Sequence, residues 1–567
     1  MIRRVLAISL FCQPLIYLAL FAGSNQLYRE IISPSLQSHL SASSITNDIP
    51  IWVLFRDRGL APYELHESIQ KVRASIDPRA LRRRQKTLPD SLVVGEWDVP
   101  VAEQYVDAIR QRSLELRTVS RWLNGVSAVV SSDLLLKIAT LPFVERIQPV
   151  GRGQANIAPY IEGESWARGA HPQSGTMGGG DYGNSYEQTA QIHVIEAHRA
   201  GYTGQGVLIA MLDTGYQLDH EAFEHLSVVD AYDFIYQDDD PSYNPNQDLR
   251  RQPRHGTATT SVIGGYAPGE LIGLAHQADF LLAKTEDNWS ETPIEEDYWV
   301  QGLEWAEGYG ADVVSSSLGY KNWYETGDYD GWTSPCSRAS NLAFELGMII
   351  CNSAGNEGPM PMTLGAPADA EGVVSVGAVD SSGMLARFSS RGPTADGRIK
   401  PDVAARGVRT TCVEPYSENR YGRWGGTSLA CPLVAGGVAL VIEAHPDWPP
   451  WRVVEAIKET ATQADRPNND YGWGIINVWA AIRYPSLSGW ILDEESGMGI
   501  PGAQMYFESE DSSGVFPSDS SGFFDAVNLP DGHYKLRATA PGYSESMWRE
   551  FRIPPDMEVD FALRKTY

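Results

Sequence analysis

The alternation of hydrophobic and polar positions is clearest in the middle of the chain, between residues 207 and 483. There, amphipathic segments separate short apolar runs, which is the pattern of a parallel β-sheet with helices on both faces. The predicted strands are Val207–Leu212, Phe280–Ala283, Val313–Ser316, Met348–Cys351 and Val373–Val376. The predicted helices are Glu295–Glu307, Ser337–Leu346, Ser428–Ala444 and Trp451–Thr460. This part of the chain is therefore predicted to form an α/β domain.

The stretches on either side follow other patterns. Residues 50–150 have a strongly charged helical segment around Arg82–Lys86 between strand-like ends, which predicts a small α+β unit. Its apolar runs are Ile51–Phe55, Ser127–Val130 and Val144–Val150. A glycine-rich stretch, Gly175–Gly183, predicts a flexible linker. In residues 487–567, Gly, Ser, Asp and Pro separate short apolar runs, as in all-β domains. These runs are Ala503–Phe507, Phe523–Val527 and Tyr534–Ala538.

The first residues have the pattern of a secretory signal peptide. Two arginines at the start precede an apolar stretch from Val5 to Phe21, and small residues follow it. An uncleaved membrane anchor is the alternative, but Gln13 and Pro14 interrupt the stretch and leave it short for a span. We therefore expect residues 1–22 to be removed. The mature protein is then expected to be secreted, either extracellular or periplasmic, without a membrane anchor.

The acidic composition narrows the range of partners. The chain has 45 Lys and Arg residues against 72 Asp and Glu residues, a formal net charge of −27. Such a surface repels phosphate backbones and anionic lipids, so we expect no nucleic acid partner. The hydrophobic fraction of 43% is that of a globular chain. Solubility outside a cell is the simplest explanation of the acidity.

Four of the five cysteines lie beyond the predicted signal peptide, which contains Cys12. They are Cys336, Cys351, Cys412 and Cys431. An exported protein could join them in disulfides, for which there are three pairings. Buried free thiols are the alternative, and the sequence leaves both open. None has the Cys-x-x-Cys spacing of a zinc or redox site.

Three reactive side chains lie at strand ends or helix starts, where open α/β sheets bind ligands. Asp213 follows an apolar strand, and a buried carboxylate is costly unless a partner such as histidine pairs with it. His255 opens a run of small residues, so a rigid helix would hold an imidazole that can act as base and acid. Ser428 follows a glycine turn at a predicted helix N-terminus, where the dipole favours negative charge. Taken alone, Asp213 could merely accept backbone hydrogen bonds in a turn and Ser428 could merely cap its helix.

Asn356 is the fourth candidate. It ends the segment Ser-Ala-Gly-Asn after a buried strand, and an uncharged donor there could hydrogen-bond an oxyanion together with the Ser428 N–H. Asn352 is a rival, but it lies nearer the interior of the strand. A turn residue that tolerates left-handed geometry is the simpler alternative for Asn356.

In this order and with these neighbours, the four segments resemble the subtilase family over about residues 190–484. The motifs are Asp-Thr-Gly at 213–215, His-Gly-Thr at 255–257, Ser-Ala-Gly-Asn at 353–356 and Gly-Thr-Ser at 426–428. The resemblance implies a doubly wound parallel sheet and peptide-bond hydrolysis through an acyl-enzyme, with no cofactor required. It gives Asp213, His255 and Ser428 the roles of a catalytic triad and Asn356 that of an oxyanion donor. It further implies a substrate-binding strand edge and a pocket wall, formed by Ser317, Leu318, Gly319, Ser353, Ala354 and Gly355.

The flanking stretches carry resemblances of their own. Residues 49–150 resemble the inhibitory, folding-assisting propeptide of secreted subtilases, most clearly at Leu123–Val130. This implies that the protein carries its own intramolecular inhibitor, which would be cut off within residues 151–189. Residues 485–567 resemble carboxypeptidase regulatory-like β-sandwich domains, for example in Ala-Pro-Gly-Tyr at 540–543.

The sequence leaves calcium and two competing functions open. Ala222 lies near where many subtilases carry a calcium-ligating aspartate, which puts that site in doubt. The acidic stretch Asp238–Asp240 could bind calcium, although a solvated loop is the simpler interpretation. A catalytically silent subtilase scaffold with a binding C-terminal domain is the main competing function. A serine esterase of the α/β-hydrolase type would need the order Ser, Asp, His, whereas the order here is Asp, His, Ser.

Overall fold

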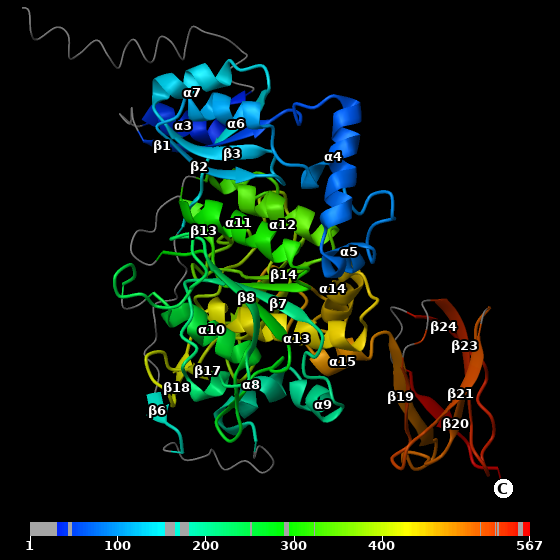
Figure 1. Cartoon of the computed structure of the whole chain (residues 1–567). Coiled ribbons are helices and arrows are strands. Elements are labelled where there is room, and N and C mark those ends of the chain that lie inside the picture. Colours follow the sequence, from blue (N-terminus) through cyan, green and yellow to red (C-terminus); the bar gives the residue numbers. More distant parts are fainter. Residues whose placement is uncertain are drawn as a thin grey trace, which may run out of the picture. The chain divides into compact units, whose positions relative to one another are not determined.

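The computed structural model describes most of the chain (Figure 1). The described residues are 31–42, 48–153, 165–169, 181–249, 252–287, 294–322, 324–510, 512–527, 529, 532–553 and 559–566. The predicted signal peptide, residues 1–22, lies outside them, as does most of the predicted linker Gly175–Gly183.

A seven-stranded parallel sheet forms the core of the α/β domain, in the order β16-β15-β14-β12-β7-β11-β8. The strands are β7 (Leu208–Asp213), β8 (Ser227–Asp233), β11 (Asp279–Lys284), β12 (Val313–Ser316), β14 (Ile349–Ser353), β15 (Val373–Val379) and β16 (Val403–Arg406). The five predicted strands are all present, and the predicted α/β fold is confirmed. The two edge strands were not predicted, because β8 is largely exposed and β16 is short and rich in alanine.

Helices cover both faces of this sheet (Figure 1). α10 (Arg254–Gly264) and α13 (Thr427–Ala444) pack together on one face, and α11 (Ile294–Gly308) and α12 (Pro335–Glu345) pack on the other. α14 (Pro450–Glu459) contacts α13. The four predicted helices correspond to α11, α12, α13 and α14 within two residues at each end. Among the described helices, α13 alone is long and apolar enough to cross a membrane, but 83% of it is buried, as in a core helix.

Shorter elements surround the sheet. They are α8 (Tyr186–Gln191), α9 (Val194–Arg199), the pair β9 (Tyr266–Ala267) and β10 (Leu271–Ile272), and a small sheet of β17 (Thr410–Val413), β18 (Arg420–Trp424) and β6 (Ser165–Ala167). β13 (Tyr320–Asn322) pairs in antiparallel fashion with β5 (Arg152–Gly153). The backbone that leaves the N-terminal stretch therefore runs along β13 as an added strand.

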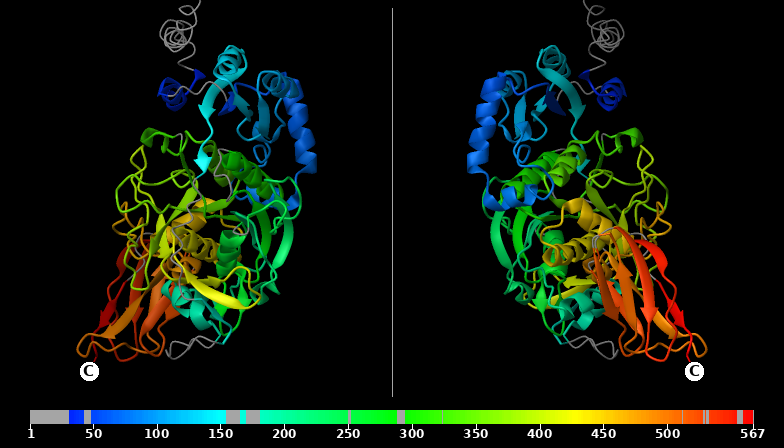
Figure 2. Two further views of the ribbon diagram at one scale, coloured as in Figure 1. Left: turned by 90° about the vertical axis from the view of Figure 1, so that its left-hand side faces the viewer. Right: turned by 90° about the vertical axis from the view of Figure 1, so that its right-hand side faces the viewer.

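The N-terminal module, defined here as residues 49–150, has its own antiparallel sheet in the order β2-β3-β1-β4. The strands are β1 (Ile49–Phe55), β2 (Glu115–Ser120), β3 (Gly125–Val130) and β4 (Val144–Pro149). One face is covered by α3 (Pro34–Ala42), α6 (Glu103–Arg110) and α7 (Ser132–Ala139), as Figure 2 shows from two sides. The predicted α+β character of this region is confirmed.

The alternation of side chains along β1 explains how the module sits on the α/β domain. Ile51, Val53 and Phe55 point into the core of the module, whereas Trp52 and Leu54 belong to the core that α11 and α12 share with the large sheet. One strand thus contributes to two cores. The module and the α/β domain accordingly form one compact unit, residues 1–476.

Acidic side chains of α11 are buried beneath the module. Asp297 accepts a hydrogen bond from Ser127 Oγ (2.6 Å) and pairs with Arg117 (2.9 Å). Glu296 accepts hydrogen bonds from the backbone N–H of Gly151 and from the Tyr324 hydroxyl. Burial raises the pKa of Glu296 to about 7 and that of Asp297 to about 6.

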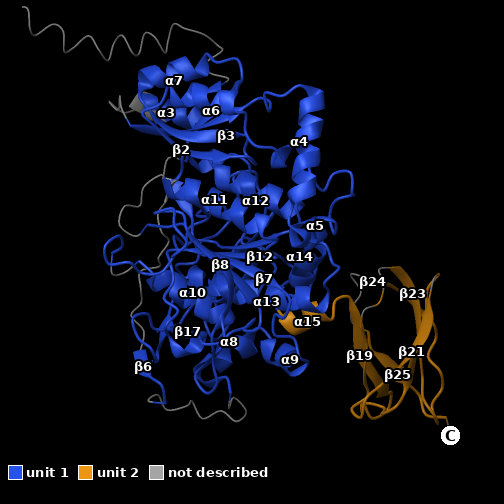
Figure 3. Ribbon diagram, in the orientation of Figure 1, with its two compact units in different colours: residues 1–476 blue, residues 477–567 orange. Residues whose placement is uncertain are grey.

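The second compact unit, residues 477–567, is built of β-strands (Figure 3). It begins with α15 (Val478–Ile482), which ends shortly before the predicted boundary at residue 484. One sheet contains β19 (Ser486–Asp493), β22 (Phe523–Val527) and β25 (Phe561–Leu563). The other contains β20 (Gln504–Glu508), β21 (Ser513–Pro517), β23 (Gly532–Thr539) and β24 (Arg549–Ile553). Alternate residues of both sheets form one apolar core, so the predicted β-sandwich is confirmed.

Glu296→Gln should flatten the pH dependence of thermal stability of the intact chain. Because the pKa of the buried carboxyl is raised, its contribution to stability is full below about pH 4.5 and is lost as the pH rises through about 7. The wild type should therefore lose more melting temperature between pH 5 and pH 8 than the variant does. Glu345→Gln, an exposed substitution on α12, is the control. An equal loss in Glu296→Gln and wild type would contradict the assignment.

Candidate active site

Asp213 is the last residue of β7, and its carboxylate is buried at the carboxyl edge of the sheet. Oδ1 accepts hydrogen bonds from the N–H of Thr214 (2.7 Å) and from Nδ1 of His255 (2.7 Å). Oδ2 accepts one from Thr259 Oγ1 (2.9 Å). Together these donors offset the cost of burying the charge. The structure thus brings Asp213 and His255 together, as the sequence argument requires.

His255 is held at the start of α10, and that helix approaches β7 closely. A Cβ atom on Gly256 would lie 2.3 Å from the carbonyl oxygen of Gly215, so only glycine permits this contact. Because Nδ1 of His255 faces Asp213, Nδ1 carries the proton in the neutral ring and Nε2 is left as the acceptor. Nε2 is buried and has no hydrogen-bond partner among the described residues.

Ser428 is the second residue of α13, directly after the turn at Gly426. Gly426 has φ = +137°, a conformation that favours glycine. Pro432, one turn further along, has no N–H to donate to the Ser428 carbonyl. The Ser317 hydroxyl donates to that carbonyl instead, at 2.9 Å. The Ser428 hydroxyl faces the carbonyl of Ser317 at 3.4 Å, which is longer than an ordinary O–H···O hydrogen bond.

Asn356 and Asn352, the two candidate oxyanion donors, differ in the hydrogen bonds that their side-chain amides make. Oδ1 of Asn356 accepts hydrogen bonds from the N–H and the hydroxyl of Thr427, both at 3.0 Å, so the NH₂ group is the end turned away from Thr427. Asn352 is fully buried in β14, and its NH₂ group donates to the carbonyl oxygens of Leu318 (3.0 Å) and Ser353 (2.9 Å). Asn352 therefore supports the chain at Leu318, and Asn356 is tied to the residue before Ser428.

The six predicted substrate-binding residues lie on two neighbouring segments of the same sheet edge. Ser317, Leu318 and Gly319 connect β12 to β13, and Ser353, Ala354 and Gly355 form the end of β14 and the turn after it. The N–H of Ala354 donates to the carbonyl of Val376 (2.9 Å), which fixes this turn to β15. β13 begins directly after Gly319 and already pairs with β5. An extended backbone therefore fits beside this part of the chain.

Two residues of the site escaped the sequence analysis. Thr259 orients Asp213, and Thr427 orients Asn356. A signal for Thr259 existed, because a residue four positions after His255 lies on the same face of a helix. Thr427 directly precedes Ser428, but nothing in its sequence context shows that it contacts a residue 71 positions away.

The part of the chain that the structure describes contains no group of three or more His, Cys, Asp or Glu side chains arranged to hold a metal ion. In the acidic stretch, Asp238 Oδ1 accepts from the N–H of Asp240, which is a hydrogen-bonded turn. Two further carboxylates near this stretch, Asp233 and Asp248, pair with the buried Lys284, both at 2.7 Å. The four cysteines beyond the signal peptide are buried free thiols, so none of the three disulfide pairings is present.

Comparisons with known proteins match three parts of the chain. Residues 204–474 match the Subtilase family, residues 50–159 the Peptidase S8 propeptide domain of Bacteroidota, and residues 486–564 the carboxypeptidase regulatory-like domain. All three agree with the resemblances found in the sequence.

Individual relatives support the same grouping. Subtilisin E of Bacillus subtilis is 32% identical over 298 residues, which are 52% of this chain and 70% of that protein. Serine protease AprX of the same organism is 30% identical over 326 residues, covering 51% of this chain and 70% of that protein. Among solved structures, fervidolysin from Fervidobacterium pennivorans has a TM-score of 0.54 at 18% identity, covering 92% of this chain and 79% of that one. The last comparison supports the fold alone.

Ser317→Ala should lower the stability of the α/β domain by about 1–3 kcal/mol, because it removes the donor that Pro432 cannot replace at the buried Ser428 carbonyl. Ser353→Ala is a matched control, since the buried Ser353 hydroxyl has no hydrogen-bond partner among the described residues. Melting temperatures of both variants give the comparison. Equal effects of the two substitutions would show that the Ser317 hydrogen bond does not support α13.

Proposed function

Because the chain belongs to the subtilase family of serine peptidases, we propose that it is a secreted serine endopeptidase with Asp213, His255 and Ser428 as its catalytic triad. The observation that carries the proposal is the buried 2.7 Å hydrogen bond between His255 Nδ1 and Asp213 Oδ1. Ser428 stands at the N-terminus of the buried helix α13, which packs against the helix α10 that carries His255. The hydrogen bond orients the imidazole and leaves its Nε2 atom as the base that would accept a proton from Ser428.

In the proposed reaction, the Ser428 hydroxyl turns from the Ser317 carbonyl toward Nε2 of His255 and attacks the carbonyl carbon of the scissile bond. His255 takes the hydroxyl proton and later gives it to the leaving amine, which yields an acyl-enzyme that water hydrolyses. Asp213 fixes the tautomer and stabilises the imidazolium. Nε2 of His255 has no hydrogen-bond partner among the described residues, and catalytic hydrogen bonds often tighten only when substrate is present.

The negative charge that develops on the substrate oxygen needs donors. The Asn356 NH₂ group and the Ser428 N–H are proposed to supply them, and the start of α13 adds the favourable end of its dipole. Thr427 supports this role, because it holds the other end of the Asn356 amide at 3.0 Å. Ser317–Gly319 would bind an extended substrate by strand addition, as β5 binds to β13.

The remaining parts of the proposal concern location and control. Export rests on the signal-peptide pattern of residues 1–22, and the chemistry requires no metal or cofactor. The N-terminal module is proposed to act as an inhibitor of the α/β domain, since the backbone leaving it runs along β13 beside the substrate edge. The peptide bond whose cleavage separates the module from the α/β domain would lie within residues 151–189.

Ser428→Ala should abolish labelling by an active-site fluorophosphonate, release of the N-terminal module and digestion of denatured casein. Wild type should show all three, because the probe reacts only with an activated serine. The measurement is a gel of both proteins incubated with probe and casein. A folded, mature wild type that neither labels nor cuts casein would favour the silent-scaffold alternative. Full activity in Ser428→Ala would remove Ser428 from the mechanism.

Asn356→Ala should lower kcat by about 100- to 1000-fold with little change in KM, the loss that removal of an oxyanion donor causes in subtilisin. Steady-state kinetics on a peptide substrate measure both constants. Asn352→Ala serves as the comparison, and it should act mainly on KM because Asn352 supports the carbonyl of Leu318. The reverse pattern, with kcat lost in Asn352→Ala and kept in Asn356→Ala, would exchange the two roles.

A further inference from the structure

The N-terminal module touches the α/β domain in two separate places. Its sheet lies on α11, close to the backbone that leads toward the active site. The arm, defined here as α4 (Pro62–Ser75) and α5 (Pro78–Arg84), extends from the module and ends at the C-terminal ends of α11 and α12 (Figure 1). The second contact lies away from the triad and needs its own explanation.

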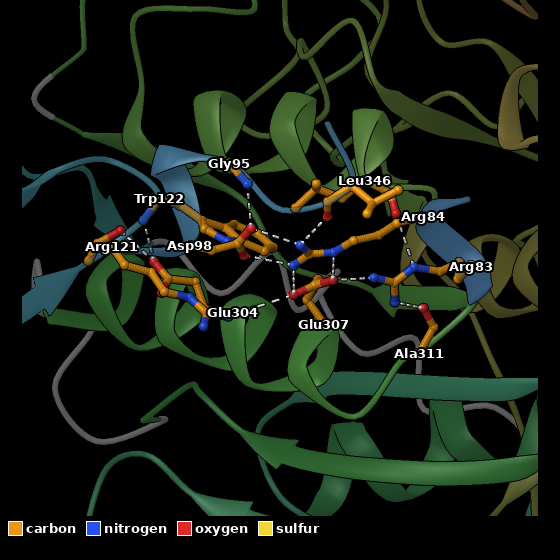
Figure 4. Close-up of polar contacts among 12 residues, drawn as sticks. Arg83, Arg84, Gly95, Asp98, Arg121, Trp122, Glu304, Glu307, Ala311 and Leu346 are labelled. Atoms are coloured by element: carbon orange, nitrogen blue, oxygen red, sulfur yellow. Dashed lines mark hydrogen bonds and ion pairs between the residues drawn. The ribbon is translucent and has the colours of Figure 1, made fainter. Parts of the chain in front are cut away.

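Arg83 and Arg84 of α5 are both 1% exposed, although arginine is almost never buried without partners. Figure 4 shows their guanidinium groups side by side against Glu307. Arg83 donates to Glu307, to the carbonyl of Ala311 (2.6 Å) and to the carbonyl of Leu346 (3.2 Å). Leu346 is the C-cap of α12, and Ala311 follows the end of α11. One guanidinium thus satisfies acceptors from the ends of two helices.

Arg84 uses all five of its N–H groups. It binds both oxygens of Glu307 and both oxygens of Asp98, each contact being 2.8 Å, and it donates to the carbonyl of Val93 at 2.8 Å. Asp98 and Val93 belong to the module itself. Arg84 is therefore held in its binding orientation before the module meets Glu307, which lowers the entropy lost on binding.

The surface that receives the arm is shaped and charged for this purpose. Glu307 lies in the last turn of α11, where a negative charge is unfavourable unless a cation is present. Gly310 and Gly347 have positive φ, and a Cβ atom on either would lie within 3 Å of α5 backbone, at Ala80 N (2.6 Å) and Arg83 O (2.9 Å). Burial opposes ionisation of Glu307, but Arg83 and Arg84 hold its pKa below the usual range.

We propose that the adjoining C-terminal ends of α11 and α12 form a recognition surface for two adjacent arginines, and that the arm anchors the N-terminal module there after the chain between them is cut. The partner that fits is the protein's own module, which presents a preordered arginine pair. The anchor rests on the proposed function, in which the module is an inhibitor. It makes release of the module a step separate from cutting of the chain.

The test uses the full chain with Ser428→Ala, so that it cannot cut itself, and with a site-specific protease sequence inserted between residues 171 and 180. After cutting by that protease, gel filtration of diluted samples gives the dissociation rate of the N-terminal fragment. Arg84→Met should raise this rate about 100-fold, because it leaves Glu307 and Asp98 with too few donors in a buried site. An unchanged rate would overturn the proposal.

Arg82→Met on the same helix is the matched control. Arg82 is exposed, lines a cavity of about 620 Å³ and makes no hydrogen bond or ion pair with α11 or α12 in the described part of the chain. The dissociation rate of the N-terminal fragment in Arg82→Met should equal that in the Ser428→Ala chain without a substitution in the arm. An equal rise of the dissociation rate in Arg82→Met and Arg84→Met would show that only the net charge of the arm matters. It would also overturn the proposal.

A variant on the other side of the contact guards against misfolding of the module. Glu307→Gln keeps the shape of the side chain and should raise the dissociation rate at least 10-fold. Combined with Arg84→Met, it should give much less than the product of the two single effects, since both remove the same contact. Multiplicative effects would show that the two residues do not act together. Melting temperatures of the uncut chains identify a variant that fails to fold. If Arg84→Met is such a variant, the dissociation rate of Glu307→Gln decides whether the anchor exists.

This design separates the anchor from the proposed activity, because the measurement uses an inactive chain. In the active chain, Arg84→Met should shorten the delay between cutting of the linker and the onset of casein digestion, while Arg82→Met should not. If the wild type never cuts its linker, the proposed peptidase function fails and the dissociation rates still decide the anchor. An unchanged delay together with a normal dissociation rate in Arg84→Met would remove the anchor and leave the peptidase function intact.

Discussion

The buried carboxylate of Asp213 is the constraint on which the geometry of the site depends. A charge at the end of a buried parallel strand must receive hydrogen bonds, and here they come from Thr214, His255 and Thr259. Two of these donors lie on α10, so the start of that helix must lie against the turn after β7. The absence of a side chain on Gly256 makes this approach possible. The position of the imidazole is therefore a consequence of satisfying one buried charge.

The position of Ser428 depends on a backbone carbonyl that lacks its usual hydrogen-bond donor. Pro432 removes the N–H that would normally bond to the carbonyl of Ser428, and Ser317 at the end of β12 replaces it. The start of α13 is thereby tied to the carboxyl end of β12. Thr427 ties the same helix start to Asn356 after β14. Ser428, Asn356 and the residues after β12 are thus joined by hydrogen bonds of short side chains, to the backbone and to one another.

The sequence predicts the elements of this fold well, because buried parallel strands and amphipathic helices have distinct periodicities. Val313–Ser316 has its predicted bounds, and the four motifs place Asp213, His255 and Ser428 at the correct strand and helix ends. Edge strand β8 was missed because its residues are largely exposed and carry little apolar signal. Helical spacing places Thr259 on the same face as His255, but the contact between Asn356 and Thr427 follows no such rule, because Thr427 reaches Asn356 across 71 positions of the chain.

The largest failure of sequence reasoning concerns charge. The sequence identifies the segment around Arg82–Lys86 only as charged and helical, and it gives no sign that Arg83 and Arg84 are buried against Glu307. Neither the arginines nor the carboxylate is informative alone, because their complementarity spans more than 200 residues.

The two ends of α11 meet the module by different physical means. Near the N-terminal end, Glu296 and Asp297 are buried with few cations, and their pKa values rise to about 7 and 6. At the C-terminal end, two guanidinium groups outweigh the burial of Glu307, and its pKa falls below the usual range. A rise in pH from 5 to 8 therefore makes the burial of Glu296 and Asp297 less favourable, while Glu307 stays ionised at the arm. The same helix thus carries one contact whose carboxyl groups titrate between pH 5 and pH 8 and one whose carboxylate stays ionised.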